Sequence, residues 1–173
     1  PSMPSHRPQP AAAPAALLPI PTLRSLHLNA LDDAIDDLAM TTNALLLRRH
    51  AVQLYQAGLD RLTISLDSLN ADTFYKLTRR NALHQALDGI DAAREAGFQK
   101  IKLNMVVLRG VNHFEIPSML DFAASIQAEV RFIEYMDVGG ANHWREEQVV
   151  SQREILQIIE KHKGPLTSIP GPE

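Results

Sequence analysis

The 173-residue sequence contains no cysteine, and this absence removes several kinds of chemistry at once. Disulfide bonds cannot form, and no thiolate of this chain can hold zinc or an iron–sulfur cluster. The seven histidines are scattered, and no two of them lie three or four residues apart, so no helical metal site is visible. We therefore expect no metal-ligating residues in these 173 positions.

Long apolar runs and strong charge are also missing. No uninterrupted apolar run approaches the roughly 18 residues of a membrane span. Arg7 is followed by Pro/Ala-rich sequence instead of a compact apolar segment, so we predict no signal peptide and expect a cytoplasmic location. The net charge of −3 gives no reason to expect nucleic acid or an anionic membrane as a partner. Neither a Gly-x-Gly-x-x-Gly run nor a P-loop occurs.

The composition indicates one globular domain, preceded by a leader segment of different composition. The sequence is 45% hydrophobic and 21% charged, which is ordinary for a soluble globular protein. Residues 1–21 hold most of the prolines with alanines between them, a composition that predicts a disordered leader. Residues 22–173 are expected to form the folded domain.

Strand-like and helix-like stretches alternate along that domain. The pattern predicts strands over 36–42, 59–66, 100–108 and 129–136. It predicts helices over 22–35, 45–57, 71–77, 83–96 and 115–127, and a final helix from 151 to about 161. Gly58 and Gly97 stand where left-handed helix C-caps belong, and Asn70 can cap the helix over 71–77. Ser151 with Glu154 makes a capping box.

A weak internal repeat supports this order. Residues 57–65 resemble residues 96–104, and each segment is a helix end, a glycine and a strand, 39 residues apart. That spacing is typical of a βα unit, so the fold class is α/β, with about four parallel strands and flanking helices. A complete eight-fold barrel needs about 250 residues, so we expect a partial (β/α) barrel.

Polar side chains gather at the strands in a way that indicates a pocket. If one face of each strand packs on helices, the other faces the lumen of the barrel. Alternation then assigns a polar set to the lumen: Thr41, Asn43, Thr63, Ser65, Asp67, Lys102, Asn104, Glu134 and Met136. Burying so many polar groups is costly unless they meet a polar ligand or water. The pattern therefore favours a cavity for a polar small molecule.

Structural roles remain open for several of these residues. Asp67 and Asn43 could cap the helices that follow them. Lys102 could pair with Asp67 or Glu134, or it could hold a phosphate or a carbonyl oxygen. Met136 could serve packing, or its soft thioether could contact an adenine face.

Several motifs together resemble a known enzyme family. They run in the family's order: residues 37–43 (Asp-Leu-Ala-Met-Thr-Thr-Asn), 64–69 (Ile-Ser-Leu-Asp-Ser-Leu), 102–104 (Lys-Leu-Asn), 106–112 (Val-Val-Leu-Arg-Gly-Val-Asn), 130–136 (Val-Arg-Phe-Ile-Glu-Tyr-Met) and 139–144 (Gly-Gly-Ala-Asn-His-Trp). The chain resembles the radical S-adenosylmethionine GTP 3′,8-cyclases of molybdenum-cofactor biosynthesis over residues 31–170, approximately.

The resemblance implies a fold, an activity and cofactors. Such enzymes have an incomplete (β/α)₆ barrel, in which a 4Fe–4S cluster cleaves S-adenosylmethionine to a 5′-deoxyadenosyl radical. The radical abstracts a hydrogen from a ribose carbon of GTP, and that carbon then bonds to C8 of guanine. The product is 3′,8-cyclo-7,8-dihydro-GTP. A second 4Fe–4S cluster near the C-terminus helps to hold GTP.

The resemblance also implies roles for single residues. Ser65 and Met136 match positions that bind S-adenosylmethionine, and Thr41 and Lys102 match positions that bind GTP. Asn43 and Asn104 are second-rank candidates, because alternation points them the same way.

The sequence departs from the family at its cluster sites. The Cys-x-x-x-Cys-x-x-Cys motif, the C-terminal cysteines and the arginines that follow them do not occur. The Gly-Gly-Glu-Pro motif would fall near Pro14, where the sequence does not match, and the family's Thr-Thr-Asn-Gly ends in Ala44 here. We expect a truncated or divergent cyclase that retains the walls of the pocket and is inactive alone.

Two other functions remain open. The chain could be a non-catalytic nucleotide-binding or interaction module, which forms a homodimer or binds a partner chain that completes the barrel. It could also be an unrelated aldolase-type barrel with Lys102 as a Schiff-base nucleophile.

Overall fold

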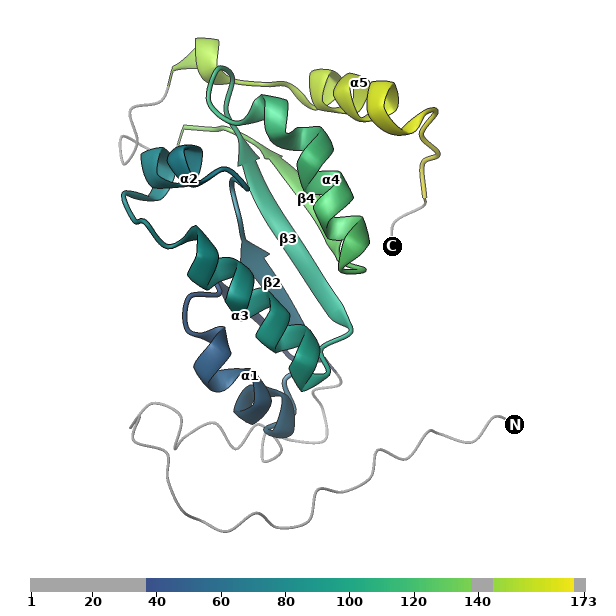
Figure 1. The fold of residues 1–173 in the computed structure, drawn as a ribbon. Helices are drawn as coiled ribbons and strands as arrows, with labels where there is room; N and C mark the ends of the chain where they lie inside the picture. The colour runs from purple at the N-terminus through teal and green to yellow at the C-terminus, as the bar shows by residue number, and fades with distance from the viewer. Residues whose placement is uncertain (1–36, 138–144, 170–173) are drawn as a thin grey trace, which may run out of the picture.

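A computed structural model describes residues 37–137 and 145–169 (Figure 1). In these ranges four strands alternate with helices: β1 (Ala39–Thr42), β2 (Arg61–Ser65), β3 (Lys100–Val107) and β4 (Glu129–Glu134). The helices are α1 (Leu47–Gln56), α2 (Ala71–Thr78), α3 (Leu83–Ala96), α4 (Ile116–Ser125) and α5 (Gln152–Lys163). Two single turns of 3-10 helix are η2 (His113–Glu115) and η3 (Glu146–Gln148).

The strands form one parallel sheet in the order β1-β2-β3-β4. Each strand pairs in parallel with the next one along the chain, which confirms the predicted α/β architecture. Residues of β2 lie opposite residues of β3 that come 39 positions later, as Arg61 does opposite Lys100. The sequence repeat is therefore the register of the sheet, with one βα unit between its two copies.

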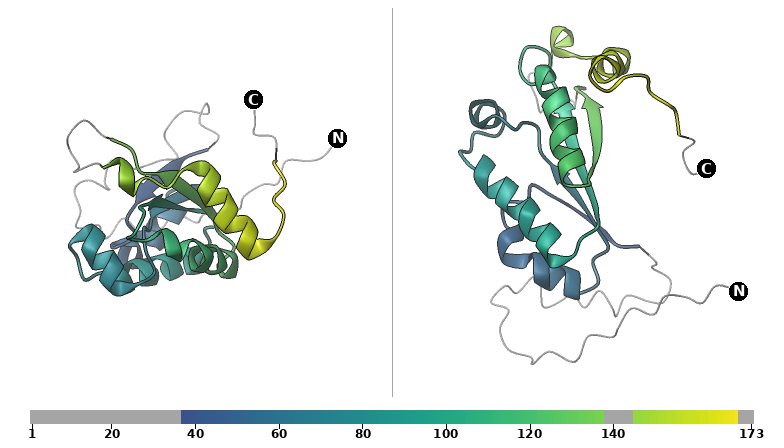
Figure 2. Two further views of the ribbon diagram at one scale, coloured as in Figure 1. Left: turned by 90° about the horizontal axis from the view of Figure 1, so that it is seen from above. Right: turned by 45° about the vertical axis from the view of Figure 1, so that its right-hand side comes forward.

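Helices α1, α3 and α4 lie on the same side of the sheet (Figure 2). The strands turn their large apolar side chains toward this side, and Leu62, Ile64, Leu103 and Met105 are fully buried there. Burial of side chains of this size contributes roughly 2 kcal/mol each, so this interface is the main source of stability. Helix α5 lies beside α4 at the β4 edge of the sheet.

Helix α3 and the chain that leads into α1 approach each other closely at Gly89. A Cβ atom on Gly89 would lie only 2.1 Å from the carbonyl oxygen of Ala44. Ala44 itself has a φ of 64°, in the left-handed region that favours glycine. Hydrogen bonds from the amides of Ala44 and Leu45 to the side chains of Thr42 and Asn43 hold this turn in place.

The predicted helix ends are confirmed where side chains or glycines define them. Asn70 caps α2 by accepting hydrogen bonds from the amides of Asp72 and Thr73. Gly97 ends α3 with a φ of 107°. Ser151 and Glu154 form the capping box of α5. Local sequence suffices here because each signal acts within four residues.

Several predicted bounds differ from the structure. Strand β4 ends at Glu134 and does not reach Met136. Helix α4 starts at Ile116, after the turn η2, although Pro117 does lie in its first turn as expected. The short turn η3 was not predicted.

Other expectations concern residues outside the described ranges: the leader over 1–21, the helix over 22–35 and the Gly139-Gly140 loop. Within the ranges that are described, no helix is both long and apolar enough to cross a membrane.

Replacing Gly89 by alanine tests the close contact between α3 and the start of α1. The added methyl group must push against backbone, so Gly89→Ala should lower the free energy of unfolding by about 1–3 kcal/mol in urea denaturation. The control Gln85→Ala changes an exposed position of the same helix and should stay within about 0.5 kcal/mol of the parent chain. A Gly89→Ala chain as stable as the control would refute the close contact.

The Glu154 carboxylate predicts a pH dependence of stability. Its pKa is lowered to about 2, first by the hydrogen bond from Arg109 and then by those from Ser151. Because this pKa lies below the unfolded-state value of roughly 4.3, the ionised carboxylate stabilises the fold at pH values above roughly 4.3. This contribution is lost as the pH falls toward about 2. Glu154→Gln should therefore lower the urea midpoint at pH 6 and reduce its fall between pH 5 and 3. The exposed control Glu160→Gln should follow the parent chain; identical curves for both variants would contradict the assignment.

Candidate functional site

The face of the sheet opposite α1, α3 and α4 is mostly polar, with Val106 and Ile133 as an apolar pair beyond the polar rows. Within the described part of the chain no helix covers it (Figure 2). The strand register places one row of side chains across all four strands: Thr41, Thr63, Lys102 and Glu129. The next row toward the carboxyl ends of the strands consists of Ser65, Asn104 and Arg131. Side chains alternate along a strand, so both rows point to the same side.

Four of the predicted site residues are thus brought together on this open face. They are Thr41, Ser65, Lys102 and Asn104. Thr41 and Ser65 are exposed, while Lys102 and Asn104 on the central strand β3 are half-buried. Asn43 lies just beyond β1, where its side chain accepts the hydrogen bond from Leu45 in the turn to α1. The helix cap that the sequence left open for Asn43 is not observed, because the N-cap residue of α1 is Leu46 and no side chain caps this helix.

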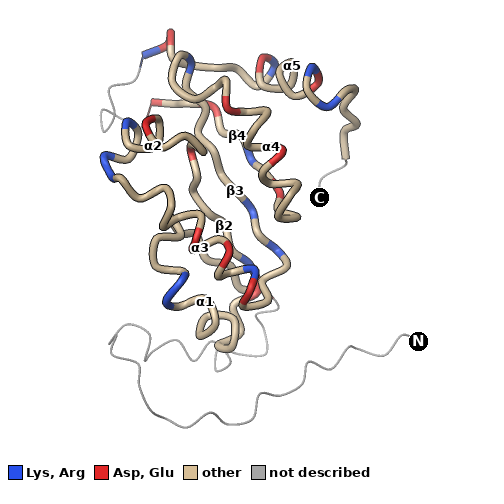
Figure 3. Tube along the Cα trace, viewed as in Figure 1, with Lys and Arg blue, Asp and Glu red and all other residues tan. Residues whose placement is uncertain are grey.

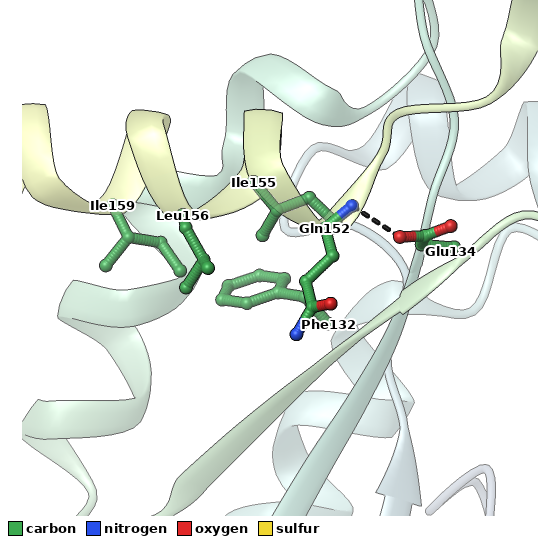
Figure 4. Close-up of a pocket in the computed structure, with 6 residues that line it drawn as sticks. All are labelled: Phe132, Glu134, Gln152, Ile155, Leu156 and Ile159. Carbon is green, nitrogen blue, oxygen red and sulfur yellow. Dashed lines mark hydrogen bonds between the residues drawn. The ribbon is translucent and has the colours of Figure 1, made fainter. Parts of the chain in front are cut away.

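The expectation that Glu134 faces the lumen is wrong. Glu134 lies opposite Val107 and two residues after Phe132, which lies opposite the buried Met105, so alternation turns Glu134 toward the helices. Its carboxylate accepts a hydrogen bond from the backbone amide of Gln152, the first residue of α5 (Figure 4). With Gln152 it borders a mostly apolar cavity of about 300 Å³, whose other lining residues are Phe132, Ile155, Leu156 and Ile159.

Met136 was assigned to the lumen with the same alternation as Glu134. It lies two residues beyond the end of β4, and its side chain is 60% exposed. Strand geometry therefore does not place Met136 in the rows of the open face. The residues of β4 that do join these rows are Glu129 and Arg131. The sequence signal for them was the alternation of Glu129 and Arg131 with Val130 and Phe132.

Lys102 has a different partner from those expected. Its Nζ lies 2.8 Å from a carboxylate oxygen of Glu129, its neighbour in the register, and not beside Asp67 or Glu134. The side chain of Lys102 is 21% exposed, whereas that of Glu129 is 69% exposed. Because the pair is open to solvent at the Glu129 end, a ligand phosphate could replace this carboxylate at modest cost.

Charged residues gather at the start of β3 (Figure 3). A hollow of about 330 Å³ lies there, and it is lined by Asp37, Arg61, Gln99, Lys100, Ile101, Lys102, Gln127 and Glu129. Arg61 forms an ion pair of 2.6 Å with Asp37. Three cations and two carboxylates therefore share this end of the open face, which gives it a net positive charge.

Asn104 leaves a polar atom without a partner. Its side-chain oxygen is buried and accepts no hydrogen bond from any described residue. An unsatisfied buried acceptor costs about 2 kcal/mol, and the donor of a bound ligand would remove this cost. The open face thus fits a polar ligand that carries hydrogen-bond donors.

Asp67, which alternation assigns to the open face, uses its carboxylate to bind the neighbouring strand. Its side chain accepts a hydrogen bond of 2.8 Å from the amide of Val106. It does not cap α2 either, since Asn70 does so. Burial raises the pKa of Asp67, and the hydrogen bond from Val106 partly opposes this. Asp67 joins the ends of β2 and β3, together with Asn112 and Glu115. The sequence analysis missed the role of the last two because their partners beyond β2 lie more than 40 residues away in the sequence.

An iron–sulfur cluster does not fit the residues present. The sequence has no cysteine. In residues 37–137 and 145–169 no three His, Asp or Glu side chains are grouped so as to hold a metal ion. No step of a reaction is therefore assigned to a cluster held by these residues.

Known proteins resemble this chain in both sequence and fold. GTP 3',8-cyclase 3 of Mycobacterium bovis is 43% identical over 136 residues, which cover 79% of this chain and 36% of that enzyme. GTP 3',8-cyclase 1 of Mycobacterium tuberculosis is 42% identical over 139 residues, covering 80% and 39%. GTP 3',8-cyclase of Marinobacter nauticus is 50% identical over 127 residues, covering 73% and 38%. The chain thus spans well under half the length of these relatives.

A solved structure shares the fold at low identity. The structure of TYW1 with a lysine-pyruvate adduct bound superposes with a TM-score of 0.52 and 16% identity, over 72% of this chain and 40% of that one. The sequence also matches the Radical SAM superfamily over residues 14–123. The four-stranded parallel sheet with its helices on one side is the corresponding part of that fold. The chain belongs to the radical SAM superfamily.

Proposed function

We propose that this chain forms the central part of a GTP 3′,8-cyclase, in which the open face of the sheet binds S-adenosylmethionine and GTP. The observation that carries the proposal is the pair of polar rows on that face, together with 42–50% identity to enzymes named GTP 3',8-cyclase. The relatives' reaction converts GTP, so a nucleoside triphosphate is the expected ligand of the positively charged end of the open face.

The two ligands are assigned to different parts of the face. Thr41 and Lys102 lie in the row nearer the charged hollow, and we assign them to GTP. Ser65 lies one row further toward the carboxyl ends of the strands, and we assign it to S-adenosylmethionine with Met136. Asn104 shares the row of Ser65, and its unpaired oxygen would accept a donor of either ligand. Asn43 stays a second-rank candidate beside Thr41.

The radical reaction needs parts that these 173 residues do not supply. A thiolate-held cluster delivers the electron that cleaves S-adenosylmethionine, and no cysteine is present to hold one. This chain would therefore bind and orient the two ligands, and cluster ligands would have to come from elsewhere. Alone, it would be inactive.

A second function rests on the same absence of cysteine. The chain would then be a non-catalytic nucleotide-binding or interaction module. Strands β1 and β4 are the outer strands of the described sheet, so a second copy or another chain could pair with either edge. Ligand binding separates the two functions, because an interaction module of this kind needs no affinity for S-adenosylmethionine.

Titration calorimetry with GTP tests the role of Lys102. We expect micromolar binding to the parent chain, and Lys102→Ala should weaken it at least tenfold, because a charge-assisted hydrogen bond to phosphate contributes roughly 1.5–3 kcal/mol. Affinity for S-adenosylmethionine should change less than twofold.

The control for this variant is Lys76→Ala, which removes the same charge from an exposed position of α2. It should leave both affinities unchanged. Equal weakening in the two lysine variants would show that only net charge matters. Absence of GTP and S-adenosylmethionine binding by the parent chain would overturn the proposed function.

Anaerobic reconstitution with iron and sulfide tests the cluster. We expect no stoichiometric iron or sulfide after desalting, and no cluster absorbance, because the chain offers no thiolates. Stable binding of about four iron atoms per chain, as in one 4Fe–4S cluster, would contradict this expectation.

A further inference from the structure

A cluster of buried polar side chains joins the loops that follow β2 and β3. Ser68 and Asn112 are fully buried, and Glu115 is 6% exposed. Asp67 belongs to the same cluster and is half-buried. Two members come from the loop between β2 and α2, and the other two come from the connection between β3 and α4. Buried polar groups are costly unless their hydrogen bonds are made, and every side chain of this cluster is hydrogen-bonded.

Asn112 uses both ends of its carboxamide. Its Nδ2 donates to the carbonyl oxygens of Asp67 and Val106, at 2.8 Å each. Its Oδ1 accepts from the amide of Leu108 at 2.7 Å. The side chain of Asp67 meanwhile accepts from the amide of Val106. Asn112 therefore bridges the chain beyond β2 to the last residues of β3, where the two backbones no longer pair.

Glu115 fixes the next residues of the same loop. Its carboxylate accepts from the hydroxyl of Ser68 at 2.8 and 2.9 Å. It also accepts from the amide of Leu69 at 2.8 Å and from that of Asn70 at 3.3 Å. Asn70 is the N-cap of α2, so the loop is held continuously from the end of β2 to the helix.

This loop starts directly behind Ser65, the last residue of β2. The amide of Leu66 still donates to the carbonyl oxygen of Asn104, at 2.9 Å. Asp67 and Asn112 then continue the connection with side-chain bonds in place of backbone bonds. A network in which every member is satisfied holds one geometry, whereas a gap in it frees the segment. The position of Ser65 and its register with Asn104 therefore depend on the loop behind them.

We propose that Asn112 is a positioning residue, which locks the loop behind β2 and so presents Ser65 to the adenosine-bearing ligand, with Glu115 as the second lock. The ligand assignment rests on the proposed function, whereas the lock itself does not. The hydrogen bonds of the Asn112 and Glu115 side chains go to residues 67–70, 106 and 108, and none goes to a side chain of the two rows. Asn112 and Glu115 would act through the backbone of residues 66–70.

The decisive variant is Asn112→Asp. It keeps the shape of the side chain, but a carboxylate oxygen then faces the two carbonyl oxygens that Nδ2 now satisfies, so both hydrogen bonds are lost. Asn81→Asp makes the same chemical change at an exposed position and serves as the control. Glu115→Gln is a milder second variant, with Glu147→Gln as its exposed control.

Amide hydrogen exchange on the full chain measures the lock. In Asn112→Asp we expect exchange of the amides of residues 66–70 to accelerate at least tenfold, while the amides of α1 and α3 keep their protection. Glu115→Gln should act in the same direction with a smaller effect. If exchange of residues 66–70 does not change, or if protection falls equally throughout the sheet and helices, the proposal is overturned.

Calorimetric titration then measures the consequence for binding. We expect Asn112→Asp to raise the Kd for S-adenosylmethionine at least tenfold and that for GTP less than twofold, a split that general destabilisation would not produce. A parallel rise of both would overturn the positioning role. If the parent chain binds neither ligand, the proposed function fails, and the exchange result alone upholds or overturns the lock.

Discussion

The in-register pairing of four parallel strands is the constraint on which this molecule depends. It puts Thr41, Thr63 and Lys102 side by side, and it puts Met40, Leu62 and Ile101 side by side one position away. Since alternate side chains point to opposite faces, a shift of one residue in any strand would exchange polar and apolar sides. Burial of the apolar side against α1, α3 and α4 fixes the register, and the polar side follows from it.

The packing of α1, α3 and α4 on the other side of the sheet therefore holds the open face in place, and the side chains of the open face contribute little to stability. This division explains how a sheet can keep an unpartnered acceptor at Asn104 and a solvent-exposed ion pair at Lys102. The unpartnered acceptor costs folding free energy, and the exposed ion pair contributes little to it. They are useful as parts of a surface that receives a polar ligand. At the carboxyl ends of the strands, the loops are held by the buried side chains of Asn112 and Glu115.

The sequence predicted what local periodicity controls and failed where the tertiary structure decides. The helix caps, the order of the elements and the shared face of Thr41, Ser65 and Lys102 follow from spacing alone. Glu134 was predicted wrongly because its charge suggested the polar face, although alternation with Phe132 turns it toward the helices, where the amide at the start of α5 meets its carboxylate. The partner of Lys102 depends on the register of β4, which no local signal fixes.

The absence of native cysteine allows the central claim to be tested with single introduced thiols. Ser65→Cys and Ile64→Cys place a thiol at adjacent positions of β2, one exposed on the open face and the other fully buried against the helices. The structure predicts that a thiol reagent modifies Ser65→Cys at a rate close to that of the unfolded chain, and Ile64→Cys only through rare opening of the fold. Equal rates at the two positions, or faster modification of Ile64→Cys, would contradict the separation of a polar open face from a helix-covered one.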